Sequence, residues 1–418
     1  MILPYMRGAL GLLVLLVIAW LLSGRKRPLP MRQIGWGIAL QVLLALFILK
    51  TPSGAVVFDF IRRVAARLIS FSGAGGSFLF GLLGTPDAAQ STVTNGAGTP
   101  VSLGFSVAFQ VLPIIVFFSA LIAICYHFGI LQRVVQVFAF IMRKSMRISG
   151  AESLAVAANI FVGNVESPMV VRPYLAEMTH SELGTVMVAG FGTIAGSVMA
   201  AYVGFGVDAG HLLAASVMSA PAAVVIAKLM FPETETPKTM NGADIDTGDK
   251  AVNVIDAAAN GAIQGLKIAA TVGAMLIAFL SLLALINYPL GLISVNGAPL
   301  SLGRIFGYLF APVAWCMGVE SKDVLAVGDL LGTKVAVNEL VGYLKLVALK
   351  NELAERSYVI ATFALCGFAN FGSIAIAIGG IGAIVPNRRT DLARIGLKAM
   401  LGGALASFMT ATIAGMML

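Results

Sequence analysis

Two glutamates in largely apolar segments are the residues of this 418-residue chain most able to do chemistry. Glu166 lies in the stretch GNVESP and Glu339 in the stretch VNEL. A carboxylate near the centre of a membrane costs a few kcal/mol, so it persists only beside polar partners or a wet cavity. An ionised carboxylate only accepts hydrogen bonds, which suits a neutral cargo rich in donors, such as a sugar diol or a base N–H. The alternative for each glutamate is a hairpin turn near the membrane surface.

Polar residues near the glutamates point to the same kind of cargo. Asn164 and Asn370 both donate and accept hydrogen bonds, so together with the glutamates they suit a nucleobase or a ribose. No arginine stands among them to bind a carboxylate, which makes an amino acid or a dicarboxylate a poorer fit. Pro168 suits the first position of a returning half-helix, whose positive end makes an ionised Glu166 less costly.

Oxygen ligands for a small hard cation are also present. Such a cation takes oxygen ligands, and broken membrane helices free backbone carbonyls for it. Asn159 and the hydroxyl of Thr193 are the candidate side-chain ligands. The alternative for Thr193 is an ordinary hydrogen bond to the preceding turn of its helix.

The composition requires a membrane around these groups. Hydrophobic residues make up 58% of the chain and charged residues 11%, far from the roughly 45–50% and 25% of a soluble domain. At roughly 20 residues a span, the length allows about eight to ten spans and no separate soluble enzyme domain. The 28 lysines and arginines stand in short clusters between apolar runs, which indicates the positive-inside rule and no nucleic-acid partner.

The apolar runs predict an all-α polytopic membrane protein with interfacial helices. Eight runs are long enough to be transmembrane helices, namely 2–22, 33–50, 106–128, 183–205, 209–230, 256–286, 357–384 and 392–417. The amphipathic stretch 54–71 is predicted to lie along the interface. Two apolar runs with polar residues near their middles, 150–178 and 320–350, predict re-entrant helical hairpins that carry Glu166 and Glu339 at their tips.

Each predicted hairpin is followed by a helix that small and polar residues interrupt. The first helix contains GFGTIAGS from Gly190 and the second GFANFGS from Gly367. The tip glutamate precedes the glycine by 24 residues in the first half and by 28 in the second, which indicates a duplicated unit. Discontinuous segments at matching positions of two halves predict a transporter binding site near the middle of the bilayer. The stretch THSE, from Thr179, predicts a capping box at the start of the first helix.

The basic clusters predict the orientation. Placing Arg25, Lys26, Arg27 and Arg32 in the cytoplasm makes both termini external and opens the first hairpin to the cytoplasm. The second hairpin then opens outward, so the repeats are inverted, as alternating access needs. Only the arginines at 62, 63 and 67 break the rule.

Three motifs resemble the concentrative nucleoside transporter family, over nearly the whole chain and in its compact bacterial form. They are NIFVGNVESP from Asn159 with VVRP from Val170, GTKVAVNE from Gly332, and CGFAN from Cys366 with Ser373. The resemblance implies a sodium-coupled symporter of the bacterial inner membrane that imports a uridine-like or adenosine-like nucleoside. It also implies a homotrimer in the lipid bilayer, with elevator-type movement of a transport domain against scaffold helices.

The same resemblance assigns roles to individual residues. Asn164, Val165 and Glu166 would face the nucleobase and Val198 would line the base pocket. The ribose would be held by Glu339, Phe368, Asn370 and Ser373. Sodium would lie between Asn159, Thr193 and the carbonyls of Val162 and Ile194.

The chain departs from the family pattern at a few of these positions. Asn164 and Val165 stand where glutamine and threonine are common, which changes the groups that face the base. Thr193 replaces a serine and keeps the hydroxyl. Proton-coupled relatives lack the asparagine that matches Asn159, so its presence favours sodium.

The expected domain organisation follows the repeats. Scaffold and interfacial helices fill 1–128, the first repeat 129–230, an acidic cytoplasmic linker 231–255, a long scaffold helix 256–300 and the second repeat 301–418. The alternatives are a proton-coupled symporter, an intramembrane enzyme and a passive channel. An enzyme would need a nucleophile with a base or a metal cluster, and no spacing typical of one occurs. Broken helices that meet buried glutamates suit an occluding site better than a pore.

Overall fold

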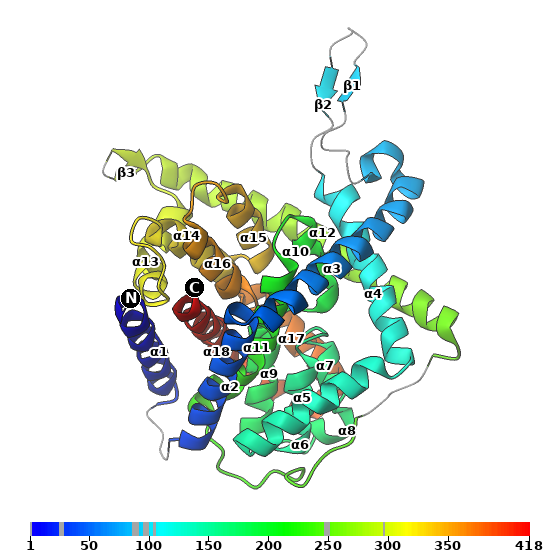
Figure 1. The fold of residues 1–418 in the computed structure, drawn as a ribbon, viewed down its shortest axis with the longest axis vertical. Coiled ribbons are helices and arrows are strands. Elements are labelled where there is room, and N and C mark those ends of the chain that lie inside the picture. Colours follow the sequence, from blue (N-terminus) through cyan, green and yellow to red (C-terminus); the bar gives the residue numbers. More distant parts are fainter. Residues whose placement is uncertain are drawn as a thin grey trace.

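The computed structural model describes residues 2–24, 29–85, 92–94, 100–102, 106–245, 251–295 and 297–418. The basic residues Arg25, Lys26 and Arg27, which carry the predicted orientation, lie outside the described residues, as do Asp246 and Asp249 of the acidic linker. Figure 1 shows an assembly of helices with a short hairpin at one end.

The first part of the chain forms long helices on the outside of the molecule. Its elements are α1 (Ile2–Leu22), α2 (Met31–Lys50), α3 (Pro52–Phe80), the 3-10 turn η1 (Gly81–Gly84), β1 (Thr92–Thr94), β2 (Pro100–Ser102), the π-helical turn η3 (Val107–Val111), α4 (Leu112–His127) and α5 (Ile130–Met146). The strands β1 and β2 pair antiparallel.

Short helices and helix breaks characterise the first repeat. Its elements are α6 (Gly150–Ala158), α7 (Glu166–Met169), α8 (Arg172–Leu175), α9 (His180–Gly192), α10 (Gly196–Gly204) and α11 (Ala209–Met230). The predicted hairpin 150–178 is confirmed as α6 followed by α7 and α8. The predicted capping box is present, because the Thr179 hydroxyl accepts from the Glu182 N–H while the Glu182 carboxylate accepts from the Thr179 N–H.

The second half repeats this pattern after one long helix. Its elements are α12 (Val254–Gly291), β3 (Ser294–Val295), β4 (Ala298–Pro299), α13 (Leu302–Cys316), α14 (Val324–Ala336), α15 (Glu339–Ala348), α16 (Glu355–Leu365), α17 (Phe371–Ile384), the 3-10 turn η4 (Pro386–Arg388) and α18 (Arg389–Met417). The helices α14 and α15 form the predicted second hairpin, and β3 pairs antiparallel with β4.

Eight helical segments in the described part of the chain are long and apolar enough to cross a membrane. Seven of them match predicted spans. The eighth is 52–84, where α3 runs beyond the predicted interfacial stretch 54–71 because small residues continue the helix to Phe80. The predicted span 357–384 is not among the eight, because the break between α16 and α17 divides it into two shorter helices.

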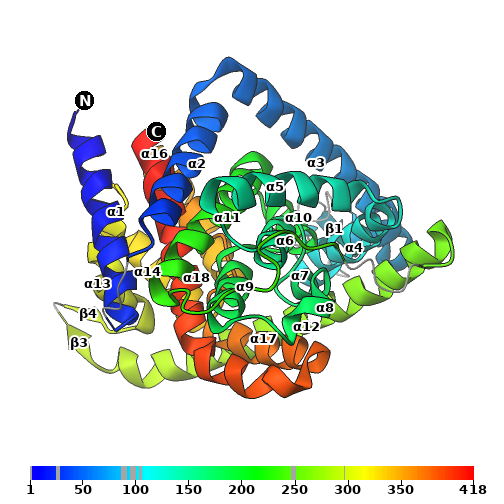
Figure 2. The same ribbon diagram turned by 90° about the horizontal axis from the view of Figure 1, so that it is seen from below.

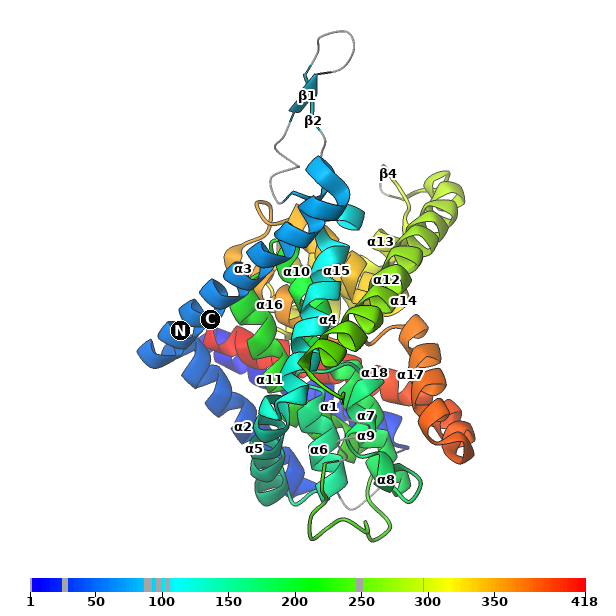
Figure 3. The ribbon, with the colours of Figure 1, turned by 90° about the vertical axis from the view of Figure 1, so that its right-hand side faces the viewer.

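The first broken helix lies at the centre of the molecule, whereas α17, which follows the second break, lies near the edge of Figures 2 and 3. Figure 2 shows α9, α11 and α18 near the middle, with α1, α2, α3 and α12 around them. The α9 helix packs closely on α18, where a Cβ atom at Gly403 would lie 2.4 Å from the Phe191 Cβ. The two hairpins lie in different halves of the helical body, α14 and α15 in the upper part and α6 to α8 in the lower part of Figures 1 and 3. This placement is what the predicted inverted repeats require.

Candidate functional site

The two helix breaks meet each other. The backbone N–H of Phe368, in the break between α16 and α17, donates to the carbonyl of Thr193, in the break between α9 and α10, at 3.3 Å. Gly367 has φ of +140°, a conformation that favours glycine. A Cβ atom there would also lie 2.8 Å from the Phe191 carbonyl oxygen. The glycine of the predicted Gly-Phe motif is thus what allows the breaks to touch.

The tip of the first hairpin lies against three other elements. The N–H of Gly196, at the start of α10, donates to the Phe161 carbonyl at 2.9 Å. A Cβ atom on Gly190 of α9 would lie 2.9 Å from the Asn164 Cβ, so the missing side chain makes room for the tip. On its other side, Val165 packs against Gly380 of α17, where an added Cβ would lie 2.5 Å from Val165 Cγ1.

Glu166 is partly buried at this tip and has a partner on the long helix α12. Its Oε1 atom accepts a hydrogen bond of 3.2 Å from Nε2 of Gln264. The carboxylate also lies beside its own hairpin backbone, since a Cβ atom on Gly163 would meet Oε2 at 2.2 Å. A carboxylate in this position has lone pairs left for a donor-rich ligand.

Glu339 is buried at the tip of the second hairpin, between the two repeats. Its Oε1 accepts from the Tyr202 hydroxyl of α10 at 2.9 Å, and its Oε2 accepts from Nδ2 of Asn370 at 2.9 Å. The Asn370 Oδ1 accepts from the Ser373 N–H at 2.8 Å and so caps α17. The structure thus brings Glu339, Asn370 and Ser373 together, as the resemblance implies.

The short helix α10 connects the two tips. Its first residue, Gly196, is bonded to the first hairpin, and Tyr202, six residues later, is bonded to the second. Six residues of α-helix rise about 9 Å. Val198 is buried on α10 between these two contacts.

Asn159 provides an oxygen suited to a cation. It is 0% exposed and lies at the end of α6, where its Nδ2 donates to the Ala155 carbonyl at 3.2 Å. Its Oδ1 has no hydrogen-bond partner among the described residues. Because a buried polar atom without a partner is costly, this oxygen fits a hard cation such as Na⁺.

The other predicted cation ligands are placed as follows. The Thr193 hydroxyl donates to the Ala189 carbonyl at 2.8 Å, which is the ordinary bond to the preceding turn. A hydroxyl oxygen that donates one hydrogen bond still has lone pairs for a cation. Ile194 is buried in the same break, and Val162 lies in the turn that follows α6.

Three polar residues near these groups were missed by sequence reasoning. Tyr202 resembles an ordinary aromatic residue of an apolar helix, and Gln264 is a single amide in a long helix. Lys334 stands five residues before Glu339, within the motif GTKVAVNE. A lysine inside an apolar hairpin was the one available signal, because such a charge is rare in a membrane segment.

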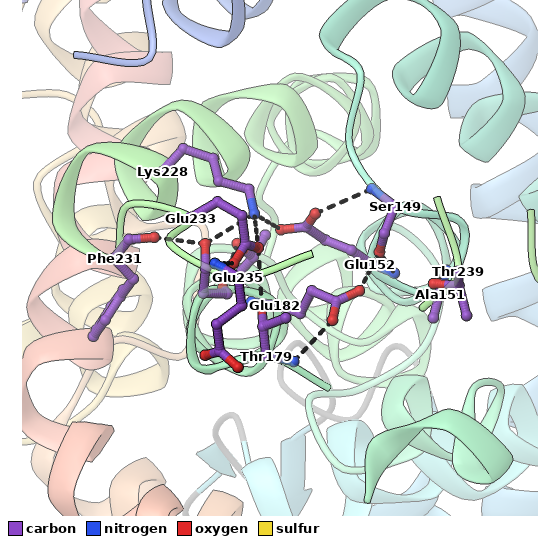
Figure 4. Close-up of polar contacts among 12 residues, drawn as sticks. Ser149, Ala151, Glu152, Thr179, Glu182, Lys228, Phe231, Glu233, Glu235 and Thr239 are labelled. Carbon is purple, nitrogen blue, oxygen red and sulfur yellow. Dashed lines mark hydrogen bonds and ion pairs between the residues drawn. The ribbon is translucent and has the colours of Figure 1, made fainter. Parts of the chain in front are cut away.

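A second buried polar cluster lies at the base of the first hairpin, and Figure 4 shows it. Lys228, near the end of α11, forms ion pairs with Glu152 of α6 at 2.7 Å and with Glu233 of the linker at 3.6 Å. Its ammonium also donates to the Ser181 hydroxyl at 2.9 Å. The predicted acidic linker is therefore anchored to the first repeat through Glu233.

Glu182 extends this cluster to the start of α9. It accepts hydrogen bonds from the Ser149 hydroxyl and, at 2.9 Å, from the Thr179 N–H. The Thr179 hydroxyl in turn donates to Glu233 at 3.0 Å. The cluster joins α6, α9, α11 and the linker into one polar base and shares no residue with the groups around Glu339.

Three family models match most of the chain. "Na+ dependent nucleoside transporter N-terminus" matches residues 10–83, "Nucleoside recognition" matches 108–209 and "Na+ dependent nucleoside transporter C-terminus" matches 211–415.

Individual proteins match over the same length. An uncharacterised transporter of Haemophilus influenzae is 44% identical, with 97% of this chain and 96% of that protein covered. Sodium/nucleoside cotransporter 1 of Homo sapiens is 39% identical over 97% of this chain and 63% of its own length.

Solved structures of the transporter CNTnw match as well, at 40% identity. Its inward-facing substrate-bound state has a TM-score of 0.90, with 99% of this chain and 98% of that chain covered. An outward-facing state of a doubly substituted form has a TM-score of 0.92, with 100% and 98% covered.

Proposed function

The chain belongs to the sodium-dependent, concentrative nucleoside transporter family, and from this premise we propose that it imports nucleosides as a secondary active symporter of the bacterial inner membrane. The matched family and its relatives are transporters and not enzymes, and the names of the family models and of several relatives give sodium as the coupling ion. The observation that carries the proposal is the connection of both hairpin tips to α10, because a ligand lying along this helix would reach two carboxylates, one from each repeat.

The nucleoside is proposed to lie along α10, with its base toward the first hairpin and its ribose toward the second. Asn164, Val165 and Glu166 would face the base, and Val198 would line its pocket. This orientation is supported by Glu166, whose carboxylate has one side-chain partner in the described structure and can accept from a base N–H.

The ribose is proposed to bind at Glu339, Asn370, Ser373 and Phe368. Glu339 accepts two hydrogen bonds from the protein, and a carboxylate has roughly four lone-pair sites. Two sites therefore remain for sugar hydroxyls. Phe368 stands in the break next to these groups and is only partly buried.

Sodium is proposed to bind between Asn159, Thr193 and the carbonyls of Val162 and Ile194. The unpartnered Oδ1 of Asn159 supports this site. The ion would add the positive charge that a hairpin with an ionised Glu166 requires, so nucleoside and sodium would be taken up together.

The transport cycle is proposed to be of the elevator type, within a homotrimer. The scaffold would comprise 1–128 and 256–300, and the moving domain the repeats 129–230 and 301–418, joined by the cytoplasmic linker 231–255. Close packing of α12 against α4 supports a common scaffold, since Cβ atoms at Gly261 and Gly265 would lie within 2.8 Å of α4. Both termini would be external.

The test is uptake of radiolabelled uridine and adenosine into liposomes that carry the purified protein. We expect accumulation with an inward sodium gradient and none with a proton gradient alone. Accumulation driven only by protons would replace sodium with the proton-coupled alternative. Uptake that ignores both gradients would refute coupled transport.

A further inference from the structure

The two tip carboxylates differ in where their partners come from. Glu339 is held at 2.9 Å by Tyr202 of α10 and at 2.9 Å by Asn370, and both of these residues belong to the repeats. Glu166 accepts its hydrogen bond of 3.2 Å from Nε2 of Gln264, which lies on α12 outside both repeats. Among the described residues, the side-chain partner of Glu166 thus belongs to the proposed scaffold.

Gln264 is fixed in place by the packing of its helix. A Cβ atom on Gly261 would lie 2.7 Å from the Ser119 carbonyl oxygen, and one on Gly265 would lie 2.8 Å from the Val116 Cα. Both neighbouring atoms belong to the backbone of α4, so α12 and α4 are in close contact on either side of Gln264. The backbone of Gln264 therefore stays with α4 when the first hairpin moves.

A shift of the first hairpin along α12 breaks the contact between Gln264 and Glu166. A donor and an acceptor more than roughly 3.5 Å apart no longer form a hydrogen bond, and one turn of α12 already rises about 5.4 Å. The bond therefore exists at one end of the proposed elevator movement. An ionised carboxylate that leaves its donor within a membrane is costly, so the empty hairpin is held against α12 at this end.

A bound nucleoside removes that cost. The base N–H groups proposed to bind at Glu166 are hydrogen-bond donors, and so is the amide of Gln264. A base that donates to the carboxylate replaces the scaffold amide and then travels with the hairpin. Glu166 thus keeps a donor when the loaded hairpin leaves α12, whereas the empty hairpin loses its donor.

We propose that Gln264 is a positioning residue that occupies the base-binding carboxylate in the empty site and retains the first hairpin against α12 until a nucleoside replaces it. This role rests on the proposed function, in which Glu166 binds the base and α12 belongs to the scaffold. The amide then competes with the base for Glu166. It also slows the movement of the hairpin when sodium is bound without a nucleoside.

The variant Q264L removes the amide and keeps most of the side-chain volume. We expect uridine to bind roughly three- to tenfold more tightly, because its competitor for Glu166 is gone; the effect is smaller than for a buried bond to a carboxylate, since Gln264 is exposed. Influx of ²²Na⁺ into liposomes without nucleoside is expected to rise by a similar factor. Weaker or unchanged uridine binding, or an unchanged sodium influx, overturns the proposal.

Two controls separate this role from a general effect on α12. T271V removes an exposed hydroxyl that bonds to its own helix and is expected to keep the wild-type values. E166A removes the acceptor, so adding Q264L to E166A is expected to leave the nucleoside-free sodium influx unchanged, whereas independent sites add their effects. An increase in the E166A background equal to that in the wild type overturns the proposal.

A second variant covers the case in which Q264L does not fold. Q264N keeps an amide that is one methylene too short to reach Glu166, and the same changes in uridine affinity and sodium influx are expected. Failure of both variants to fold overturns the proposal, because a contact made at one end of a movement does not determine folding. Wild-type protein that neither binds nor takes up uridine refutes the proposed function instead.

Discussion

At the scale of single residues, the proposed site depends on how Glu339 is held. Both of its direct partners are neutral donors, one from each repeat, so the carboxylate is oriented without being neutralised by contact. Hydrogen bonds to a charged group contribute about 1.5–3 kcal/mol each. The two bonds therefore fix which lone pairs face a ligand.

Tyr202→Phe removes one of these donors while keeping the ring. We expect uridine affinity to fall roughly tenfold or more, because a bond of about 1.5–3 kcal/mol orients Glu339. Equilibrium binding of labelled uridine measures the change. The matched control is Tyr343→Phe, since Tyr343 stacks on Tyr202 with ring centres 4.6 Å apart but donates to the Thr362 carbonyl. An affinity loss of equal size in both variants would refute the role of the Tyr202 hydroxyl in orienting Glu339.

Glu166→Gln and Glu339→Gln test the acceptor role of the two carboxylates. Each amide replaces one acceptor oxygen by a donor. We expect uridine uptake to fall about 10–100-fold in each variant, with size-exclusion profiles like that of the wild type. Glu177→Gln, at an exposed glutamate paired with Lys238, is expected to leave uptake unchanged. Normal uptake in both site variants would take the glutamates out of the site.

Asn159→Ala tests the sodium ligand. Removing the unpartnered oxygen should raise the half-saturating sodium concentration at least tenfold, a scale on which even outer-shell partners change metal affinity. Sodium titrations of uridine uptake provide the measurement. Asn260→Ala removes an exposed asparagine near the start of α12, which is bonded to Asp256, and should leave the titration unchanged. A wild-type titration for Asn159→Ala would place sodium elsewhere.

The sequence predicted part of this residue set. Four of these polar residues interrupt apolar segments, namely Glu166, Asn164, Asn370 and Asn159. Because polar side chains are costly in a membrane, their presence there indicated a functional site. Tyr202 could not be recognised in this way, because aromatic residues are common in apolar helices. Its hydroxyl became meaningful only through a bond to a residue 137 positions away.

At the scale of elements, the base of the first hairpin is held by charge as well as by packing. Lys228 contacts two carboxylates from different elements and is itself buried. Removing one partner of a buried pair is strongly destabilising because the other charge stays behind. The cluster therefore fixes where α6 and α9 begin.

Lys228→Met is expected to lower the free energy of unfolding by about 3–5 kcal/mol, since it leaves Glu152 buried without its cation. Thermal unfolding in detergent provides the measurement. Lys238→Met breaks a pair with side chains 67% and 57% exposed and should cost about 1 kcal/mol or less. Similar losses of unfolding free energy in both variants would show that the buried cluster stabilises the protein no more than an exposed ion pair does.

The hairpins and the helix breaks were predictable because glycine, asparagine and proline interrupt the apolar periodicity there. The extent of α3 was not predictable. Its stretch GAGGS would favour a turn in a soluble protein, but here the helix continues through it to Phe80. The helix α13 was missed as a separate element, because Pro312 and two glycines weaken its pattern. These differences concern the outer elements, which contain none of the predicted site residues.

At the scale of the whole molecule, the two repeats are joined by helix packing and by a backbone hydrogen bond. The last helix, α18, packs against α9 and α11 of the first half and against α16 of the second. The bond between Phe368 and Thr193 joins the breaks themselves. We therefore expect the repeats to move together as one unit against α12.

The proposed homotrimer is tested by the mass of the purified protein. The outer helix α12 exposes large apolar residues that lipid or a second copy must cover, among them Ile263, Leu266, Ile277 and Leu285. Given a chain mass of 43.5 kDa, native mass spectrometry should find a species of about three chains, since most oligomers have closed symmetry. A monomer as the dominant species would contradict the trimer.

The bond between Tyr202 and Glu339 also sets an order of events on the ribosome. The 137 residues between them take roughly 7–27 s to synthesise at 5–20 residues per second. During that interval α10 has left the ribosome while its carboxylate partner does not yet exist. The hydroxyl must then be satisfied by water or by the insertion machinery. The polar contacts of the first repeat are therefore complete only after the second hairpin has been synthesised. A translational stall between the two repeats would leave the Tyr202 hydroxyl in the membrane without Glu339.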